Sequence, residues 1–233
     1  MSARKASAVT TRLADQLIEN VRNLDDRQVI EDVELSRCTF VDAVLVQHVN
    51  PAPSLVVRNL RATGCTVNHC RVSGVRFEDI TIAGLSVRGG TQSLRGCVLS
   101  HVKLSGRVGP LNITSPLPVP DGELVPGAGQ ALVDAYRSID WALDISEAEF
   151  AHVSLTYVPG DLVRRDPRTQ FLLRRENLSK LEGRELPKDA DVLVDQLNLT
   201  PFDSTVVVAP TRSKQFRWFL ETLEVLRDIG LAE

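Results

Sequence analysis

Apolar and polar residues recur with a period of five in the middle of the chain. Between residues 55 and 89, the first and third residues of each unit are apolar or a thiol, the second is mostly polar, and the last two favour turns. The units read LVVRN, LRATG, CTVNH, CRVSG, VRFED, ITIAG and LSVRG. Because successive side chains of a strand point to opposite faces, the first and third residues face an interior and the second faces outward. The pattern predicts short strands separated by corners and stacked on a continuous apolar core.

The same pattern extends in both directions along the chain. It begins at VELSR, CTFVD and AVLVQ (33–47) and returns at CVLSH and VKLSG (97–106). The register shifts around 50–53 and 89–92, which suits loops that leave a corner. Four cysteines occupy first positions of units, and we expect them to be buried, reduced thiols. They are Cys38, Cys65, Cys70 and Cys97.

Residues 31–113 resemble the pentapeptide-repeat proteins, whose units combine a small residue, Asp or Asn, and Leu or Phe with two variable positions. The resemblance implies a right-handed quadrilateral β-helix, a solenoid with about four coils in these residues. Well-known members of the family protect DNA gyrase by imitating the acidic surface of DNA. The second positions here are polar and on balance basic, as at Arg61, Arg71 and Arg76, which does not suit that imitation.

The N-terminal residues carry a different spacing. Leu13, Leu17, Val21 and Leu24 recur at helical intervals and predict an amphipathic helix over residues 10–24. We expect this N-terminal segment, residues 1–30, to cap the repeat, because an uncapped repeat exposes its core and its strand edges. A contact in a homodimer is the alternative role.

A domain boundary is expected after Leu111, where proline and glycine accumulate and predict a linker over 114–127. Residues 128–233 are expected to form a small α/β (α+β) domain with a mostly antiparallel sheet. Its expected elements are a helix at 129–139, a strand at 150–158, a hairpin turning at 166–169, a strand at 205–209 and a helix at 214–229. The predicted fold is therefore a β-helix with an N-terminal capping helix, followed by an α/β domain.

Composition excludes some partners. The formal net charge is -3 and the sequence pI is about 5.9, so a general affinity for double-stranded DNA or for an anionic membrane is not expected. The sequence has no charged-then-apolar leader, and no apolar run approaches the ~18 residues that span a bilayer. We expect a cytoplasmic protein that binds no membrane.

Candidate chemistry is sparse. No nucleophile with a base, no metal-ligand set and no phosphate-binding loop occurs at a diagnostic spacing, so we predict no enzyme activity, no cofactor and no metal. An anion or nucleotide site is predicted where arginines crowd into the hairpin and where the last helix offers free backbone N–H groups. Its residues are Arg164, Arg165, Arg168, Arg174, Arg175, Arg212, Ser213 and Lys214. The alternative is an ordinary N-cap at Ser213 and arginines that are solvated or paired with nearby carboxylates.

The leading functional prediction is a non-catalytic interaction or scaffold protein that presents both domains to a protein partner. A gyrase-binding protector and an anionic-ligand or nucleotide-binding C-terminal domain are the alternatives.

Overall fold

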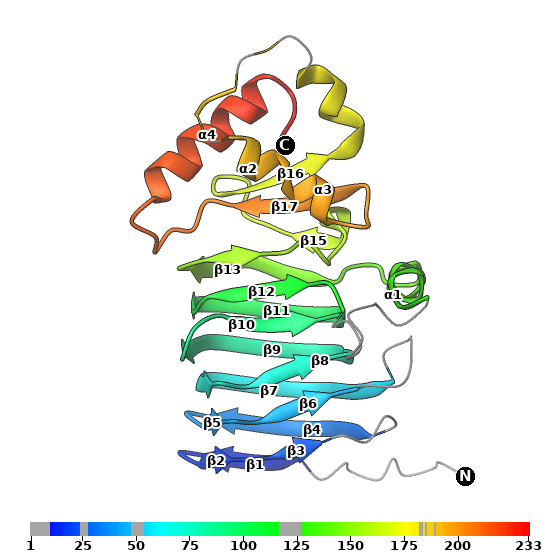
Figure 1. The fold of residues 1–233 in the computed structure, drawn as a ribbon. Coiled ribbons are helices and arrows are strands. Elements are labelled where there is room, and N and C mark those ends of the chain that lie inside the picture. The colour runs from blue at the N-terminus through cyan, green and yellow to red at the C-terminus, as the bar shows by residue number, and fades with distance from the viewer. Residues whose placement is uncertain are drawn as a thin grey trace, which may run out of the picture.

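The structure, a computed structural model, describes residues 10–23, 28–47, 54–116, 127–181, 184, 186–188 and 190–233. Parallel strands dominate these residues and stack as layers (Figure 1). They form one sheet of nine strands and one of six, and a two-stranded antiparallel sheet follows nearer the C-terminus.

The nine-stranded sheet has the order β1, β4, β7, β9, β11, β13, β15, with β2 and β5 joined beside this path. Its strands are β1 (Thr11–Ala14), β2 (Leu17–Glu19), β4 (Val29–Ser36), β5 (Thr39–Val41), β7 (Leu55–Asn68), β9 (Val75–Arg88), β11 (Val98–Val108), β13 (Leu143–Phe150) and β15 (Val163–Arg164).

The six-stranded sheet has the order β14, β12, β10, β8, β6, β3. Its strands are β3 (Arg22–Asn23), β6 (Val44–Val46), β8 (Arg71–Ser73), β10 (Gln92–Arg95), β12 (Leu111–Thr114) and β14 (Val153–Ser154). The chain visits the two sheets in turn and adds a strand to each at every pass. Val57 of β7, for example, pairs with Phe77 of β9, which pairs with Leu99 of β11.

The corners of the layers fall on every fifth residue of each repeat block. These residues have a positive φ, which glycine adopts freely and which Asn, Asp and His tolerate better than most other residues. They are Asp15, Asn20, Asp32, Arg37, Asp42, Asn59, Gly64, His69, Gly74, Asp79, Gly84, Gly89, Gly96, His101 and Gly106. Between the corners, Leu55, Val57 and Cys65 are buried, whereas the second-position residues Arg61 and Thr81 are exposed.

The predicted fold class is corrected by this sheet topology. The strands do not form the four short faces of a quadrilateral β-helix solenoid, but two multi-strand parallel sheets. The reason is visible in β7, which continues through the corners at Asn59 and Gly64. It keeps pairing with β9 on both sides of these corners, so that neighbouring faces merge into one sheet. The resemblance to pentapeptide-repeat proteins itself stays a prediction.

The predicted N-terminal capping helix is wrong. Residues 11–23 form β1, β2 and β3, which pair in parallel with β4, β5 and β6. Asp15 and Asn20 have φ values of 55°, which an α-helix does not contain. The edge of the next layer offers hydrogen-bond partners that an isolated short helix lacks, and the helical spacing of Leu13, Leu17 and Val21 does not outweigh them. Leu24 and residues 1–9 lie outside the described residues.

The predicted separate α/β domain is also corrected. The parallel sheets continue past residue 113 through β13, β14 and β15. The predicted hairpin does not form, because β15 pairs with β13 whereas β16 (Gln170–Arg174) pairs with β17 (Ser204–Val208). Most of the predicted linker, residues 117–126, lies outside the described residues.

Helices occupy the side and one end of the stack (Figure 1). They are α1 (Ala128–Tyr136), α2 (Asp191–Val194), α3 (Gln196–Leu199) and α4 (Phe216–Asp228), with 3-10 turns η1 (Gly160–Leu162) and η2 (Arg175–Leu181). The predicted final strand and helix are confirmed as β17 and α4, and Gly230 ends α4 with a φ of 78°. Leu223 and Leu226 of α4 are buried against Phe171 and Leu173 of β16.

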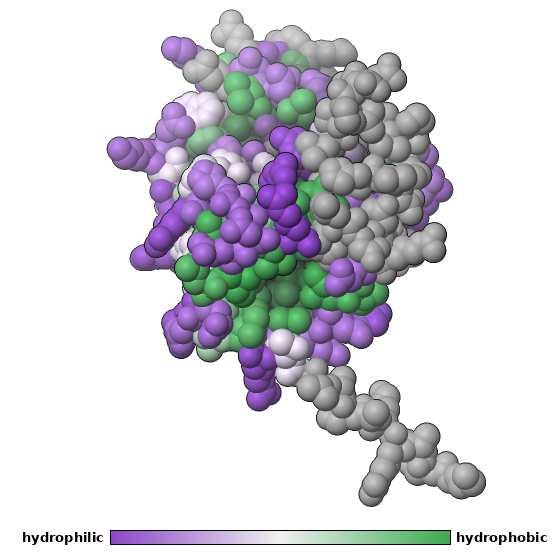
Figure 2. All heavy atoms as spheres, turned by 60° about the horizontal axis from the view of Figure 1, so that its bottom comes forward, coloured by the Kyte–Doolittle hydropathy of each residue, from purple (hydrophilic) through white to green (hydrophobic). Residues whose placement is uncertain are grey.

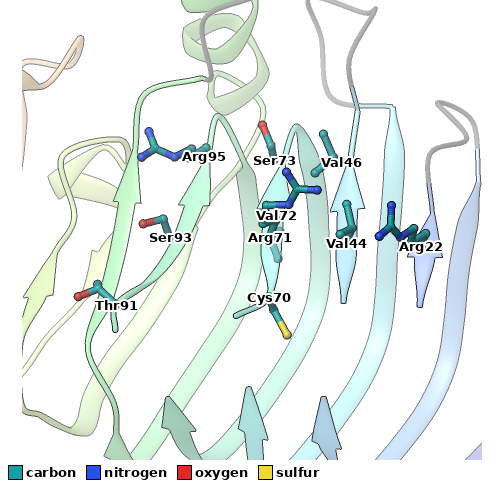
Figure 3. A pocket seen from close by; sticks show the side chains of 10 residues that line it. All are labelled: Arg22, Val44, Val46, Cys70, Arg71, Val72, Ser73, Thr91, Ser93 and Arg95. Carbon is teal, nitrogen blue, oxygen red and sulfur yellow. The ribbon is translucent and has the colours of Figure 1, made fainter. Parts of the chain in front are cut away.

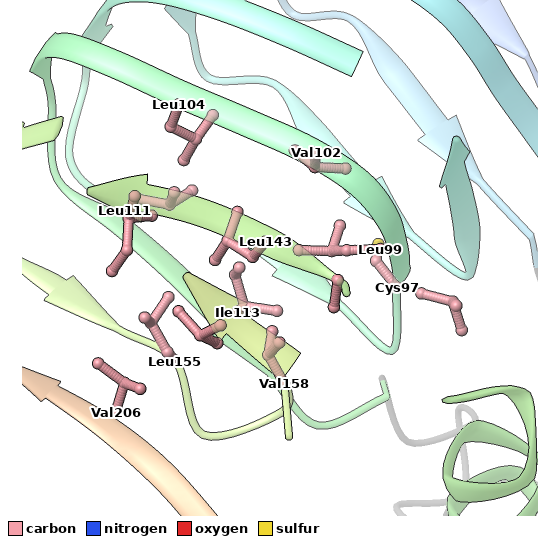
Figure 4. Close-up of a cluster of buried hydrophobic side chains, with 14 of the residues drawn as sticks. Cys97, Leu99, Val102, Leu104, Leu111, Ile113, Leu143, Leu155, Val158 and Val206 are labelled. Carbon is pink, nitrogen blue, oxygen red and sulfur yellow. The ribbon is translucent and has the colours of Figure 1, made fainter. Parts of the chain in front are cut away.

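One buried cluster joins the parallel sheets to the C-terminal part. Ile113 of β12 and Leu155 after β14 belong to the same cluster as Val206 and Val208 of β17 (Figure 4). This end of the stack is therefore covered by the antiparallel pair and the helices around it. The cysteines are free thiols, and burial raises the pKa of Cys97 to about 12, so this thiol behaves as a small hydrophobic residue.

Candidate functional site

The first three arginines of the predicted anion site lie in three different environments. Arg164 lies over the ring of Trp141, 4.0 Å from its centroid. Arg168 donates hydrogen bonds to Asp166, with 3.0 Å between Nε and Oδ1, and this contact lowers the pKa of Asp166. The Nε atom of Arg165 is buried and has no hydrogen-bond partner among the described residues.

Arg174 and Arg175 hold the C-terminal part together. Arg174 pairs with Asp161 at 2.6 Å and with the side chain of Glu233 at 2.9 Å. Arg175 donates from Nη2 to three backbone carbonyls, those of Leu197, Thr200 and Phe202, at 2.6, 3.1 and 3.2 Å. Both guanidinium groups therefore donate their hydrogen bonds to acceptors within the same chain.

The loop before α4 contains the remaining predicted residues. The backbone N–H of Arg212 donates to the carbonyl of Phe150, which fastens the loop to β13. The hydroxyl of Ser213 accepts a hydrogen bond from the N–H of Gln215 at 3.1 Å, and Lys214 is exposed. The eight predicted residues therefore make separate local contacts. Arg168 and Arg174 pair with nearby carboxylates, which is the alternative that the sequence left open.

His101, Asp79, Asp140 and Trp141 form a cluster of side chains that sequence reasoning did not single out. His101 lies between two carboxylates, with Nδ1 3.0 Å from Asp79 and Nε2 2.6 Å from Asp140. Its ring contacts Trp141, with 4.9 Å between the centroids. The hydrogen bond to Asp140 raises the pKa of His101, and the same bond lowers the pKa of Asp140. The cluster links β9 and β11 to the segment before β13. Asp79 and His101 are corner residues of neighbouring layers, so the five-residue repeat could have placed these two side chains next to each other.

At the other end of the stack, no described element covers the last layer. We call β1, β2 and β3, with their connecting residues 10–23, the end layer. β1 and β3 begin the two sheets, and β2 pairs only with β5. One edge of each of these strands therefore lacks a partner strand among the described residues.

The open end also leaves core positions uncovered. Leu13 and Val21 occupy third and first positions of five-residue units, yet 36% and 45% of their surfaces are exposed. Cys38, an inward residue of the next layer, is buried by contrast. Leu17 of β2 pairs with the second-position residue Thr39, so it faces outward, and it is 61% exposed beside these core positions. Figure 2 shows the hydrophobic residues gathered on the face that carries the end layer. The end layer combines exposed apolar area with unpaired strand edges, the two features that favour strand addition.

The charges of the end layer balance. Arg12 and Arg22 are its cations and Asp15 and Glu19 its anions. Arg12 pairs with Glu34 of β4, and Asp15 pairs with Arg37, so these charges also tie the end layer to the next. Two copies of the end layer could therefore face each other without repulsion between net charges of the same sign.

Comparisons with protein-family models, curated proteins and solved structures gave no match. Within the described ranges, no helix is long and apolar enough to cross a membrane. The same residues contain no group of three or more His, Cys, Asp or Glu side chains placed to hold a metal ion.

Proposed function

We propose that this protein is a non-catalytic scaffold that pairs with a second copy of itself through the end layer. The observation that carries the proposal is the end of the stack, where β1, β2 and β3 each have an edge with no partner strand among the described residues, beside exposed Leu13, Leu17 and Val21. The non-catalytic part rests on the sequence, which has no catalytic motif at a diagnostic spacing.

Two observations favour a second copy as the occupant. The end layer has no net charge, so two identical surfaces meet without like-charge repulsion. The opposite end of the stack is covered by β17 and the helices, and Val206 is buried there. Head-to-tail stacking would need two open ends, whereas contact between two end layers uses the same surface on both copies and closes after two.

A two-fold axis at the end layer would reverse the strand direction of one copy. β1 of one copy would then lie antiparallel to a strand of its partner, and antiparallel pairs join the edges of parallel sheets readily. The pairing would cover the core positions at Leu13 and Val21. Each dimer would present two copies of every remaining surface in one fixed orientation, which is the action of a scaffold.

The test measures molar mass by light scattering and sedimentation over a wide concentration series. The wild-type protein is expected to be a dimer. The double variant Leu17→Lys/Val21→Lys is expected to be a folded monomer, because edge lysines oppose strand pairing.

The matched control is Val192→Lys/Leu199→Lys. These two apolar residues of α2 and α3 are 57% and 60% exposed, similar to Leu17, but lie at the covered end. We expect this control to remain a dimer. A monomeric wild-type protein would overturn the proposal, as would a dimer that both double variants weaken equally.

A further inference from the structure

A groove lies on the outer face of the six-stranded sheet, where it crosses β3, β6, β8 and β10 (Figure 3). Its volume is about 460 Å³, within the range of sites that hold small molecules. Three arginines, three hydroxyl-bearing residues, three valines and one cysteine line it: Arg22, Arg71, Arg95, Ser73, Thr91, Ser93, Val44, Val46, Val72 and Cys70.

Strand register brings the three arginines to this groove. Val44 of β6 pairs with Arg22 of β3 on one side and with Arg71 of β8 on the other. In the neighbouring row, Ser73 of β8 pairs with Val46 and with Arg95 of β10. Figure 3 shows Arg22 and Arg71 on opposite sides of Val44. The arginines come from three different layers and surround an apolar floor.

The three guanidinium groups of the groove have no partner among the described residues. The side chains of Arg22, Arg71 and Arg95 make no hydrogen bond or ion pair with the residues that the structure describes. Arg12 and Arg37, which are also surface arginines of the stacked layers, each pair with a carboxylate. None of the described residues that line the groove is acidic, so its positive charge is not compensated by this part of the chain.

We propose that this groove binds a small phosphate-bearing molecule with an apolar portion. Guanidinium groups match phosphate oxygens geometrically, and the hydroxyls of Ser73, Thr91 and Ser93 add donors beside them. Val44 and Val46 contact the carbon part of the ligand. The groove is large enough for such a molecule, and of its three arginines only Arg22 belongs to the end layer.

Binding is tested by calorimetry with phenyl phosphate as the probe, because it joins a phosphate to an apolar group. Inorganic phosphate and benzoate are run alongside it. Phenyl phosphate is expected to bind more tightly than inorganic phosphate, since only it contacts the valines, and more tightly than benzoate, since a carboxylate accepts fewer hydrogen bonds. Raised salt is expected to weaken binding, because exposed charges are screened over ~10 Å at 0.1 M ionic strength.

Two variants that each remove one arginine charge distinguish binding in the groove from a general effect of the protein's charge. Arg71→Gln is expected to raise the Kd of phenyl phosphate about tenfold, the loss of roughly one charge-assisted hydrogen bond. Arg88→Gln removes an exposed arginine of β9 that does not line the groove, and it is expected to change the Kd less than about twofold. No saturable binding to the wild-type protein, equal losses in the two variants, or tighter binding of benzoate would each overturn the proposal.

Discussion

Tyr136 supplies a hydrogen bond that a missing strand would otherwise make. The backbone N–H of Leu99 in β11 donates to the hydroxyl of Tyr136 at 3.1 Å. The backbone pairing of β11 with the next layer starts later, where the N–H groups of His101 and Val102 donate to the carbonyls of Trp141 and Ala142. The last residue of α1 therefore takes the place of a strand, and Tyr136→Phe tests this role.

The expected cost follows from the burial of both groups. Leu99 and Tyr136 are buried, so water cannot replace the lost acceptor. An unsatisfied buried N–H destabilises a protein by about 1–3 kcal/mol. The edge-to-face contact of Tyr136 with Phe202, with 5.4 Å between the centroids, does not involve the hydroxyl and survives in the variant. We therefore expect the free energy of unfolding to fall by about 1–3 kcal/mol.

Urea denaturation followed by circular dichroism measures this loss. The slope of the unfolding free energy against urea concentration should be the same for the variant and the wild-type protein. The melting temperature should fall by about 2–4 °C for each kcal/mol in a chain of this size.

The matched control is Tyr157→Phe, which removes the chain's other tyrosine hydroxyl. Tyr157 is half-buried, and its hydroxyl makes no hydrogen bond with the described residues. This control should change stability by less than about 0.5 kcal/mol. If the two variants lose the same stability, Tyr136 does not replace a strand partner.

Two further predictions concern the His101 cluster and the packing of Gly160. The pKa of His101 is raised above its ordinary 6.5. The extra stability of the wild-type protein over His101→Gln should therefore be complete below pH 6.5 and lost as pH rises through the folded-state pKa. Urea midpoints of both proteins between about pH 5 and pH 8 test this, and a difference in stability that does not change with pH contradicts it. Gly160→Ala should cost about 1–3 kcal/mol, because the new Cβ would lie 2.8 Å from the backbone nitrogen of Thr205. Gly129→Ala in α1 meets nothing within 4 Å and should stabilise by about 0.5–1 kcal/mol, so the opposite order in denaturation would refute the packing argument.

Local chemistry in the sequence was enough to locate the corners and much of the interior. Asn59, Gly64 and His69 close consecutive five-residue units, and each has the positive φ that a corner needs. Leu55 and Cys65 are buried as first-position residues. These features depend on a residue's own conformational preference and on alternation along a strand, both of which act over a few residues.

The N-terminal segment could not be resolved by periodicity. Leu13, Leu17 and Val21 suit one face of a helix, and they also suit short strands with corners at Asp15 and Asn20. The choice depends on the open edge of β4, which offers hydrogen bonds only after the next layer has formed. Likewise, β15 and β16 read as a hairpin in sequence, but each pairs with a distant strand.

The predicted ligand residues show the same limit. Arginines crowd together along residues 164–175, yet Arg174 and Arg175 are committed to partners far along the chain, at Glu233 and at the carbonyl of Thr200. Arg22 and Arg71 are distant in sequence, yet both flank Val44.

The sequence by itself therefore determined the period, the corners and which residues of a unit face inward, because these follow from backbone conformation and nearest neighbours. Only the tertiary structure decided which charges remain without partners and which strand edges remain open. Each depends on how the layers are aligned, and that alignment follows from hydrogen bonding between segments that are far apart in the chain.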